Sequence, residues 1–286
     1  MNANNIKIIE CPRDAMQGIS EFIPTSKKLN YLNKLLTVGF DTIDAGSFVS
    51  PKAIPQMRDT AALFEQLDMS STNSKLLAIV ANKRGADEAV TFNQLTYLGY
   101  PLSLSETFQQ RNTNRSIDTA LNDLIEIQNM CIQRSKQLVV YLSMGFGNPY
   151  NDPYNADYLQ LFTQKLDALE IGIISLADTI GVSNSDTIKM AFSTLIPQYP
   201  HIEFGAHLHS KPQEVEIKLE AALEAGCKRF DGAIKGFGGC PMAKDELVGN
   251  MATEKMLDYF SKHKIAIGLD TRAFEEAMTM SEELFH

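Results

Sequence analysis

The sequence predicts a (β/α)8 TIM barrel, in which parallel strands alternate with helices around a closed sheet. From residue 6 onward, short apolar runs alternate with amphipathic segments. There are eight such units in 286 residues, or about 36 residues per unit, which is close to the ~250 residues of a typical barrel. A doubly wound sheet would also alternate, but no GxGxxG sequence follows the first apolar run, so the barrel is the better interpretation.

Each strand is predicted where a short apolar run is bounded by polar residues or glycine. The predicted strands are 6–11, 40–45, 76–81, 95–100, 138–144, 172–178, 202–209 and 230–234. Helices are predicted where apolar residues recur with helical spacing, at 26–38, 55–67, 84–90, 117–135, 156–169, 185–196, 212–225 and 250–262. No repeat or linker divides the chain, so we expect one domain over 1–286, with 265–286 as a short C-terminal helical extension packed on the barrel.

Composition excludes several functional classes. The chain is 44% hydrophobic and 21% charged, as in ordinary globular proteins. Its net charge of -9, without a basic run, argues against a nucleic-acid partner. No apolar run is long enough for a membrane helix and the first residues do not form a signal peptide, so we expect no membrane partner and a cytoplasmic protein. The four cysteines form no CxxC pair, which indicates reduced thiols.

Polar residues gather where the predicted strands end, and barrels carry their active sites at that face. Arg13 and Asp14 follow strand one, Asp44 lies at the end of strand two, and Asp178 ends strand six. His207 and His209 close strand seven, and Cys240 and Asn250 follow strand eight. Taken singly, each has an ordinary structural interpretation, such as a helix cap or a local ion pair. Together they converge on one mouth of the barrel, where buried charges need partners or ligands.

His207 and His209 indicate a divalent-metal site. Strand side chains alternate, so both imidazoles point to the same side of strand seven. A hydrogen-bonded polar pair is the alternative interpretation. With Asp14 and the Asn250 carbonyl, the two nitrogens would make a mixed N/O ligand set, which suits Mg²⁺ or Mn²⁺ and also admits Zn²⁺ or Co²⁺. We favour Mg²⁺ or Mn²⁺.

Cys240 lies in a glycine-rich loop. Gly238 and Gly239 precede it and Pro241 follows it. Glycine permits backbone angles closed to other residues and lets a ligand approach the main chain. The loop suits a reactive thiol, although a buried, inert thiol is the simpler interpretation of one cysteine.

Several stretches in order along the chain resemble the 3-hydroxy-3-methylglutaryl-CoA lyase family. This family lies in a larger group of barrels that includes isopropylmalate and homocitrate synthases and ketoacid aldolases. The matching stretches are Cys-Pro-Arg-Asp-Ala-Met-Gln at 11–17, Gly-Ser-Phe-Val-Ser-Pro-Lys at 46–52, Ser-Glu-Thr-Phe at 105–108, Ser-Leu-Ala-Asp-Thr-Ile-Gly-Val at 175–182, Ala-His-Leu-His at 206–209, Gly-Gly-Cys-Pro at 238–241 and Gly-Asn-Met-Ala-Thr-Glu at 249–254.

The resemblance implies an acyl-CoA substrate, cleaved to acetyl-CoA and acetoacetate as in leucine degradation. It also implies a homodimer and a Mg²⁺ or Mn²⁺ ion held by Asp14, His207, His209 and Asn250. Arg13 would stabilise the enolate, His207 or a water beside it would accept a proton, and Cys240 would return one. Asp44 and Glu254 match further catalytic positions, and Gln17, Ser47, Ser105 and Asp178 match substrate-side positions.

The chain departs from the family pattern at several places, which include Ala15, Met242 and residues 211–214. Ser210 stands where an acidic residue is expected after the second histidine, and residues 243–248 are charged and one residue longer than expected. Two alternatives therefore stay open. The first is a related metal-dependent 2-oxo-acid aldolase or Claisen-type synthase, which would not need Cys240. The second is a barrel that has lost catalysis.

Overall fold

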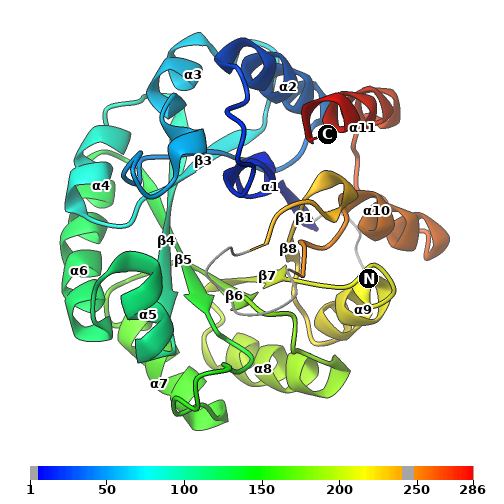
Figure 1. The fold of residues 1–286 in the computed structure, drawn as a ribbon. Coiled ribbons are helices and arrows are strands. Elements are labelled where there is room, and N and C mark those ends of the chain that lie inside the picture. The colour runs from blue at the N-terminus through cyan, green and yellow to red at the C-terminus, as the bar shows by residue number, and fades with distance from the viewer. Residues whose placement is uncertain (1–5, 240–247, 286) are drawn as a thin grey trace.

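Eight parallel strands close into a barrel in the computed structural model, which describes residues 6–239 and 248–285 (Figure 1). Each strand pairs with the next along the chain, and β8 pairs with β1 to close the sheet. The strands are β1 (Lys7–Glu10), β2 (Thr42–Ser47), β3 (Lys75–Ile79), β4 (Leu95–Ser103), β5 (Gln137–Ser143), β6 (Ile173–Asp178), β7 (Glu203–Leu208) and β8 (Arg229–Gly232). The predicted barrel is confirmed.

Most helices surround the barrel on its outer side, whereas α1 (Pro12–Gln17) lies inside this ring, beside β1 (Figure 1). The other helices are α2 (Thr25–Val38), η2 (Pro55–Met57), α3 (Thr60–Gln66), α4 (Lys83–Ala89), α5 (Glu106–Thr113), α6 (Ile117–Gln133), α7 (Ala156–Asp167), α8 (Ser185–Gln198), α9 (Val215–Glu224), η3 (Ile234–Gly236), α10 (Thr253–Lys262) and α11 (Thr271–Phe285). None of the described helices combines the length and the apolar character needed to cross a membrane.

The C-terminal helix α11 is the predicted extension, and it lies beside α2 (Figure 1). Aromatic rings join it to the barrel: Phe285 meets Tyr31 edge-on at 5.8 Å between ring centroids, and Phe274 meets Phe40 at 6.3 Å. Edge-to-face pairs of this kind add to the stabilisation from buried area. The extension is therefore part of the barrel's packed outer layer.

Three local predictions differ from the structure. The short helices α1 and α5 were not predicted, because six to eight residues give too little periodicity. The predicted helix 55–67 is divided into η2 and α3. The predicted helix at 250–262 begins only at Thr253, because Asn250 forms an antiparallel bridge with His209 and Ala252 a parallel one with Ala233.

Alternation along the strands separates two cores. On β3, Leu76 and Ala78 join the large cluster between sheet and helices, whereas Leu77 and Ile79 join a small cluster with Tyr97 and Tyr141. This division follows from the two-residue period of a strand, with successive side chains on opposite faces of the sheet. The small cluster fills the barrel interior beneath the site described below.

Glu10 fixes the chain where it leaves β8 and where it enters α10. Its buried carboxyl accepts hydrogen bonds from the Ile234 amide at 2.8 Å and from the Thr253 hydroxyl at 2.6 Å. Burial raises the pKa of Glu10 to about 8; the two hydrogen bonds oppose the rise and the nearby Glu254 charge adds to it. Both ends of the segment that carries Cys240 are thus attached to one side chain of β1.

Replacing Glu10 with glutamine should reduce the loss of stability at high pH. A carboxyl whose folded pKa lies above its unfolded pKa favours folding at low pH, and this contribution is lost as pH rises through about 8. Glu10→Gln cannot ionise, so its free energy of unfolding relative to wild type should rise by a few kcal/mol between pH 5 and pH 9. Urea unfolding at both pH values measures the difference, and a constant difference contradicts a buried, neutral Glu10.

Candidate metal and active site

Helix α1 places three polar side chains at the mouth of the barrel. Pro12 occupies its first turn directly after β1, so the chain turns sharply and puts Arg13, Asp14 and Gln17 on one helical turn. Gln17 donates to Asp14 Oδ1 at 2.5 Å and accepts from Arg13 Nη1 at 3.0 Å. The three side chains therefore orient one another.

Asp44, inside β2, fixes the guanidinium of Arg13. Arg13 Nε lies 3.0 and 3.2 Å from the two oxygens of Asp44, and Nη2 also donates to Asp44. Burial raises the pKa of Asp44 to about 6, while the Arg13 charge opposes the rise, so the pair is ionic at neutral pH. Because Nη1 is bonded to Asp14 and Gln17, all but one N–H donor of Arg13 has an acceptor among the described residues. The remaining donor, on Nη2, is available to a substrate.

The two histidines lie side by side at the end of β7, as the sequence predicted. Their ring centroids are 5.4 Å apart. His209 Nδ1 lies 2.9 Å from the carbonyl oxygen of Thr179, which can only accept, so this nitrogen carries the proton and Nε2 keeps its lone pair. Burial, with the neighbouring His207, lowers the pKa of His209 to about 4. His209 is thus a neutral imidazole, the form that binds metal.

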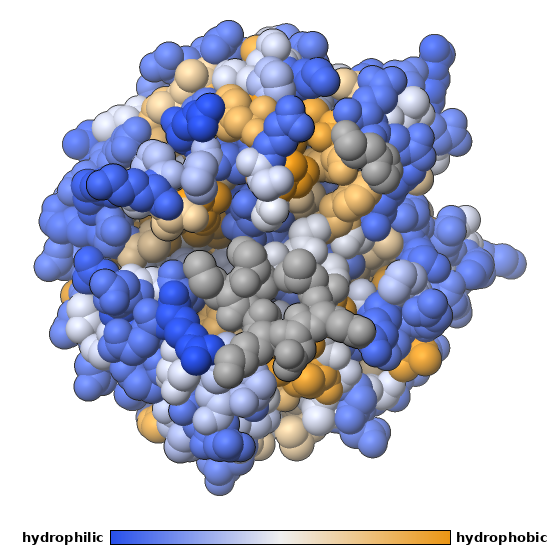
Figure 2. All heavy atoms as spheres, in the orientation of Figure 1, coloured by the Kyte–Doolittle hydropathy of each residue, from blue (hydrophilic) through white to orange (hydrophobic). Residues whose placement is uncertain are grey.

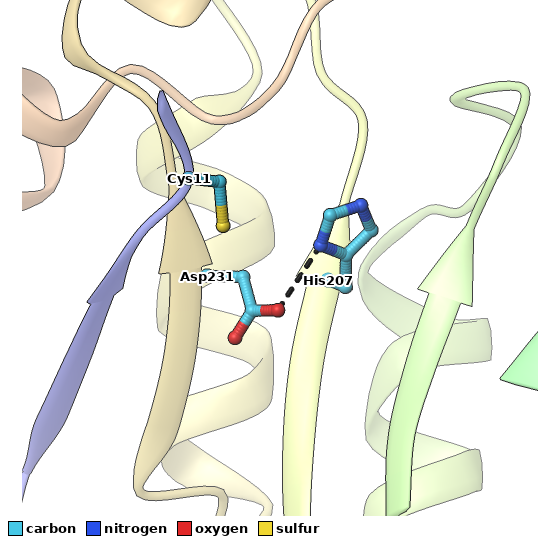
Figure 3. A group of neighbouring side chains, drawn as sticks. All are labelled: Cys11, His207 and Asp231. Carbon is cyan, nitrogen blue, oxygen red and sulfur yellow. Dashed lines mark hydrogen bonds and ion pairs between the residues drawn. The ribbon is translucent and has the colours of Figure 1, made fainter. Parts of the chain in front are cut away.

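Asp231 on β8 holds His207 and was not among the predicted site residues. Its Oδ2 lies 3.1 Å from His207 Nδ1, while Cys11 is the third side chain of this group (Figure 3). Burial alone would lower the pKa of His207, but the hydrogen bond and charge of Asp231 raise it. Asp231 stands inside a strand and outside any motif quoted above. The only signal for it in the sequence is the alternation of side chains along β8, which turns this one toward His207 on β7.

Asn250 closes the site from the far end of the chain. Its Nδ2 donates to Asp14 Oδ2 at 2.5 Å and to the Phe237 carbonyl at 2.9 Å, which turns its carbonyl oxygen away from these acceptors. Gly238 passes close by, because a Cβ on it would meet Asn250 Nδ2 at 2.6 Å and the Asp14 carbonyl at 3.0 Å. The chain therefore enters the 240–247 segment directly beside Asp14 and Asn250.

The residues present fit a divalent cation. Asp14, His207 and His209 each offer a ligand atom, and these atoms lie within 4.8 Å of one another. The Nδ1 atoms of both histidines are occupied by Asp231 and Thr179, which leaves their Nε2 atoms for a metal. Burial would raise the pKa of Asp14, but Arg13, the histidines and Asn250 lower it below its usual value, so the carboxylate is charged.

A cavity of about 140 Å³ opens from this group. Its lining combines Arg13, Asp14 and the two histidines with apolar side chains, and it also includes hydroxyl and amide groups. The apolar residues include Val49, Ile54, Ile79, Phe108 and Ala177, and the other polar ones include Asn112, Thr113 and Ser143. Apolar side chains gather near the centre of the face shown in Figure 2. The cavity therefore offers charged groups to the polar end of a ligand, and apolar side chains to an alkyl group.

Comparison with known proteins assigns the chain to a family. The HMGL-like family model matches residues 5–280. The chain belongs to the HMGL-like family. It is 30% identical to a hydroxymethylglutaryl-CoA lyase of Bacillus subtilis, over 86% of this chain and 81% of that protein. It is 28% identical to the 3-hydroxy-3-isohexenylglutaryl-CoA/hydroxy-methylglutaryl-CoA lyase of Pseudomonas aeruginosa, over 95% of this chain and 90% of that protein.

Solved structures agree with this assignment. An HMG-CoA lyase from Acinetobacter baumannii, in complex with coenzyme A and 3-methylmalate, superposes with a TM-score of 0.92 at 29% identity, covering 100% of this chain and 92% of that one. The HMG-CoA lyase of Bacillus subtilis gives 0.91 at 28% identity, covering 98% of this chain and 93% of that one. This HMGL-like chain therefore shares both fold and sequence pattern with lyases over nearly its whole length.

The remaining predicted site residues of this HMGL-like chain lie around the cavity rather than on its wall. Ser105 caps α5, accepting from the Phe108 amide and donating to Asp152. Ser47 accepts from the Val49 amide. Asp178 is bonded to the loop after β6, and Glu254 accepts from the Lys235 amide. Their predicted roles stay predictions, and Cys240 lies outside the described residues.

Asp231→Asn should weaken Mn²⁺ binding by about 10–100-fold, the usual effect of losing the carboxylate behind a metal-binding histidine. Asparagine keeps an acceptor for the Nδ1 hydrogen bond but removes the charge that makes the imidazole a better ligand. Titration of chelator-treated protein with Mn²⁺, followed by electron paramagnetic resonance, measures the affinity.

Asp167→Asn is the matched control. Asp167 faces His201 Nε2 at 2.6 Å on the outer side of the molecule, so losing this carboxylate should not change Mn²⁺ affinity. Equal affinities for Asp231→Asn and wild type would contradict the metal-side role of His207.

Proposed function

We propose that this chain is a divalent-metal-dependent carbon–carbon lyase that cleaves 3-hydroxy-3-methylglutaryl-CoA, or a close 3-hydroxyacyl-CoA, to acetyl-CoA and acetoacetate. The observation that carries the proposal is the shared cavity, where Arg13 and the group of Asp14, His207 and His209 face the same space. Family membership and the lyases named above support the same chemistry. The ion we propose is Mg²⁺ or Mn²⁺, held by Asp14, His207, His209 and the Asn250 carbonyl, the last after the Asn250 amide turns over from its present contact with Asp14.

Cleavage requires the C3 hydroxyl to lose its proton while the bond between C2 and C3 breaks. A bound divalent ion supplies Lewis acidity that lowers the pKa of this hydroxyl. With an ion on Nε2, both nitrogens of His207 would have partners, because Nδ1 already faces Asp231. Of the two proton acceptors that the resemblance implied, His207 itself and a water beside it, we therefore assign the departing proton to the water.

Arg13 stabilises the charge that develops on the leaving group. As the C2–C3 bond breaks, its electron pair moves into the thioester and forms the acetyl-CoA enolate. The one N–H on Arg13 Nη2 that has no acceptor among the described residues is the donor we assign to this oxygen. Asp44 holds the guanidinium beforehand, so little reorganisation is needed as the charge moves.

Cys240 is proposed to protonate C2 of the enolate and so complete acetyl-CoA. An ordinary thiol has a pKa near 8.5, which suits a proton donor at neutral pH. Gly238, two residues before Cys240 in the sequence, lies close to Asp14 and Asn250, which supports the assignment. The apolar wall of Val49, Ile54 and Phe108 is proposed to receive the C3 methyl group. A homodimer and a cytoplasmic location remain predictions from the sequence.

The direct test is to incubate purified protein with Mg²⁺ or Mn²⁺ and 3-hydroxy-3-methylglutaryl-CoA and to measure acetoacetate. We expect metal-dependent release of acetoacetate and acetyl-CoA in equal amounts. Arg13→Lys should lower kcat by about 10²-fold or more with a smaller change in KM, because lysine cannot keep the bidentate contact to Asp44 and still reach the enolate.

Arg58→Lys is the control, since Arg58 stacks on the Phe22 ring outside the metal group and should keep near wild-type kcat. Cleavage of a 2-oxo acid, with no acetoacetate from the acyl-CoA, would favour the aldolase alternative. Turnover of neither substrate would favour a barrel without catalysis.

A further inference from the structure

Lys218 is a buried lysine that the catalytic scheme above does not use. It lies on α9, and its side chain is only 3% exposed. Its ammonium group donates to Asp178 Oδ2 at 2.9 Å and to the backbone carbonyl of His209 at 2.8 Å. A longer contact of 3.4 Å reaches the Gly181 carbonyl. Burying an ammonium group is costly unless it is fully paired, so this arrangement requires an explanation.

The contacts of Lys218 complete the attachment of His209 to the end of β6. The His209 amide donates to the Asp178 carbonyl at 3.2 Å, and its ring Nδ1 contacts the Thr179 carbonyl at 2.9 Å. Lys218 binds the third polar group of the same residue, its carbonyl oxygen. The amide, the ring and the carbonyl of His209 are therefore all fixed, and within residues 6–239 and 248–285 its Nε2 has no hydrogen-bond partner.

Asp178 makes this attachment rigid. Its Oδ1 accepts from the Val182 amide, and its Oδ2 accepts from the Ser183 amide and hydroxyl as well as from Lys218. A carboxylate held by several donors cannot follow a moving lysine, so Lys218 is anchored to the backbone of the loop after β6. Position 210, after His209, is a serine here, whereas the family pattern has an acidic residue, so this position adds no second carboxylate beside Lys218.

We propose that Lys218 is a positioning residue for the metal site: by clamping the His209 carbonyl to Asp178, it fixes the backbone from which the imidazole reaches the ion. The proposal rests on the proposed function, because it requires that His209 binds a metal. Lys218 acts through His209 and does not touch substrate or metal. Small displacements of a ligand backbone weaken coordination, and loss of such outer contacts typically costs about 10–100-fold in metal affinity.

The test compares Mn²⁺ affinity, by isothermal titration of chelator-treated protein, between wild type and Lys218→Met. We expect affinity to fall by about 10-fold or more. Because Lys218→Met leaves Asp178 without its cation, a second variant, Asp178→Asn with Lys218→Met, removes both charges. It still lacks the donor to the His209 carbonyl, so we expect its affinity to be equally weak.

Lys28→Met is the matched control. Lys28 is also fully buried, and its ammonium group contacts Asp59 at 2.8 Å and the Gln56 backbone carbonyl, outside the metal group. Its loss should lower the melting temperature without changing Mn²⁺ affinity. Thermal unfolding, measured alongside, identifies any variant that does not fold.

The outcomes separate the inference from the function on which it rests. Wild-type affinity in Lys218→Met, recovery in the charge-free double variant, or an equal loss in Lys28→Met would each overturn the positioning role while leaving the metal site intact. Absence of Mn²⁺ binding by the wild type would overturn the proposed metal site itself.

Discussion

The site depends on one buried carboxylate, that of Asp14. It is 5% exposed, and it accepts hydrogen bonds from Arg13, Gln17 and Asn250. A buried charge without such partners would cost several kcal/mol, so the fold must bring these donors together. Arg13 and Gln17 come from the same helical turn, whereas Asn250 lies 236 residues away in the sequence. Closing the barrel between β1 and β8 is what allows the two ends of the chain to share this charge.

A second set of contacts gives each group at the mouth of the barrel a single orientation. Asp44 fixes the guanidinium of Arg13, Asp231 fixes the imidazole of His207, and the Thr179 carbonyl fixes that of His209. Each supporting group comes from a strand or from the residue directly after one, that is, from the most rigid part of a barrel. Groups held in this way need little reorganisation when charge develops, which is how such sites accelerate reactions.

The sequence allowed the barrel to be predicted, and it named Asp14, His207 and His209, which the structure brings together, but it did not give the supporting contacts. Strand and helix periods locate the eight units, and the end of a predicted strand marks each of Arg13, Asp14, Asp44 and His207. Asp231 and Lys218 carry no such signal: one lies inside β8 and the other on a helix face, and only the packed structure turns them toward the histidines. Ser105 was named from a motif, and in the structure its hydroxyl caps α5 and donates to Asp152. The motif identifies the residue but not the partners of its side chain.

The most direct test of this account is anomalous diffraction from crystals soaked with Mn²⁺. The account predicts a single strong site per chain among Asp14, His207 Nε2, His209 Nε2 and Asn250, with metal–ligand distances of about 2.0–2.3 Å. Two outcomes would contradict the account. One is a peak at the neighbouring group of Cys11, His207 and Asp231, and the other is no peak near His209 at saturating Mn²⁺.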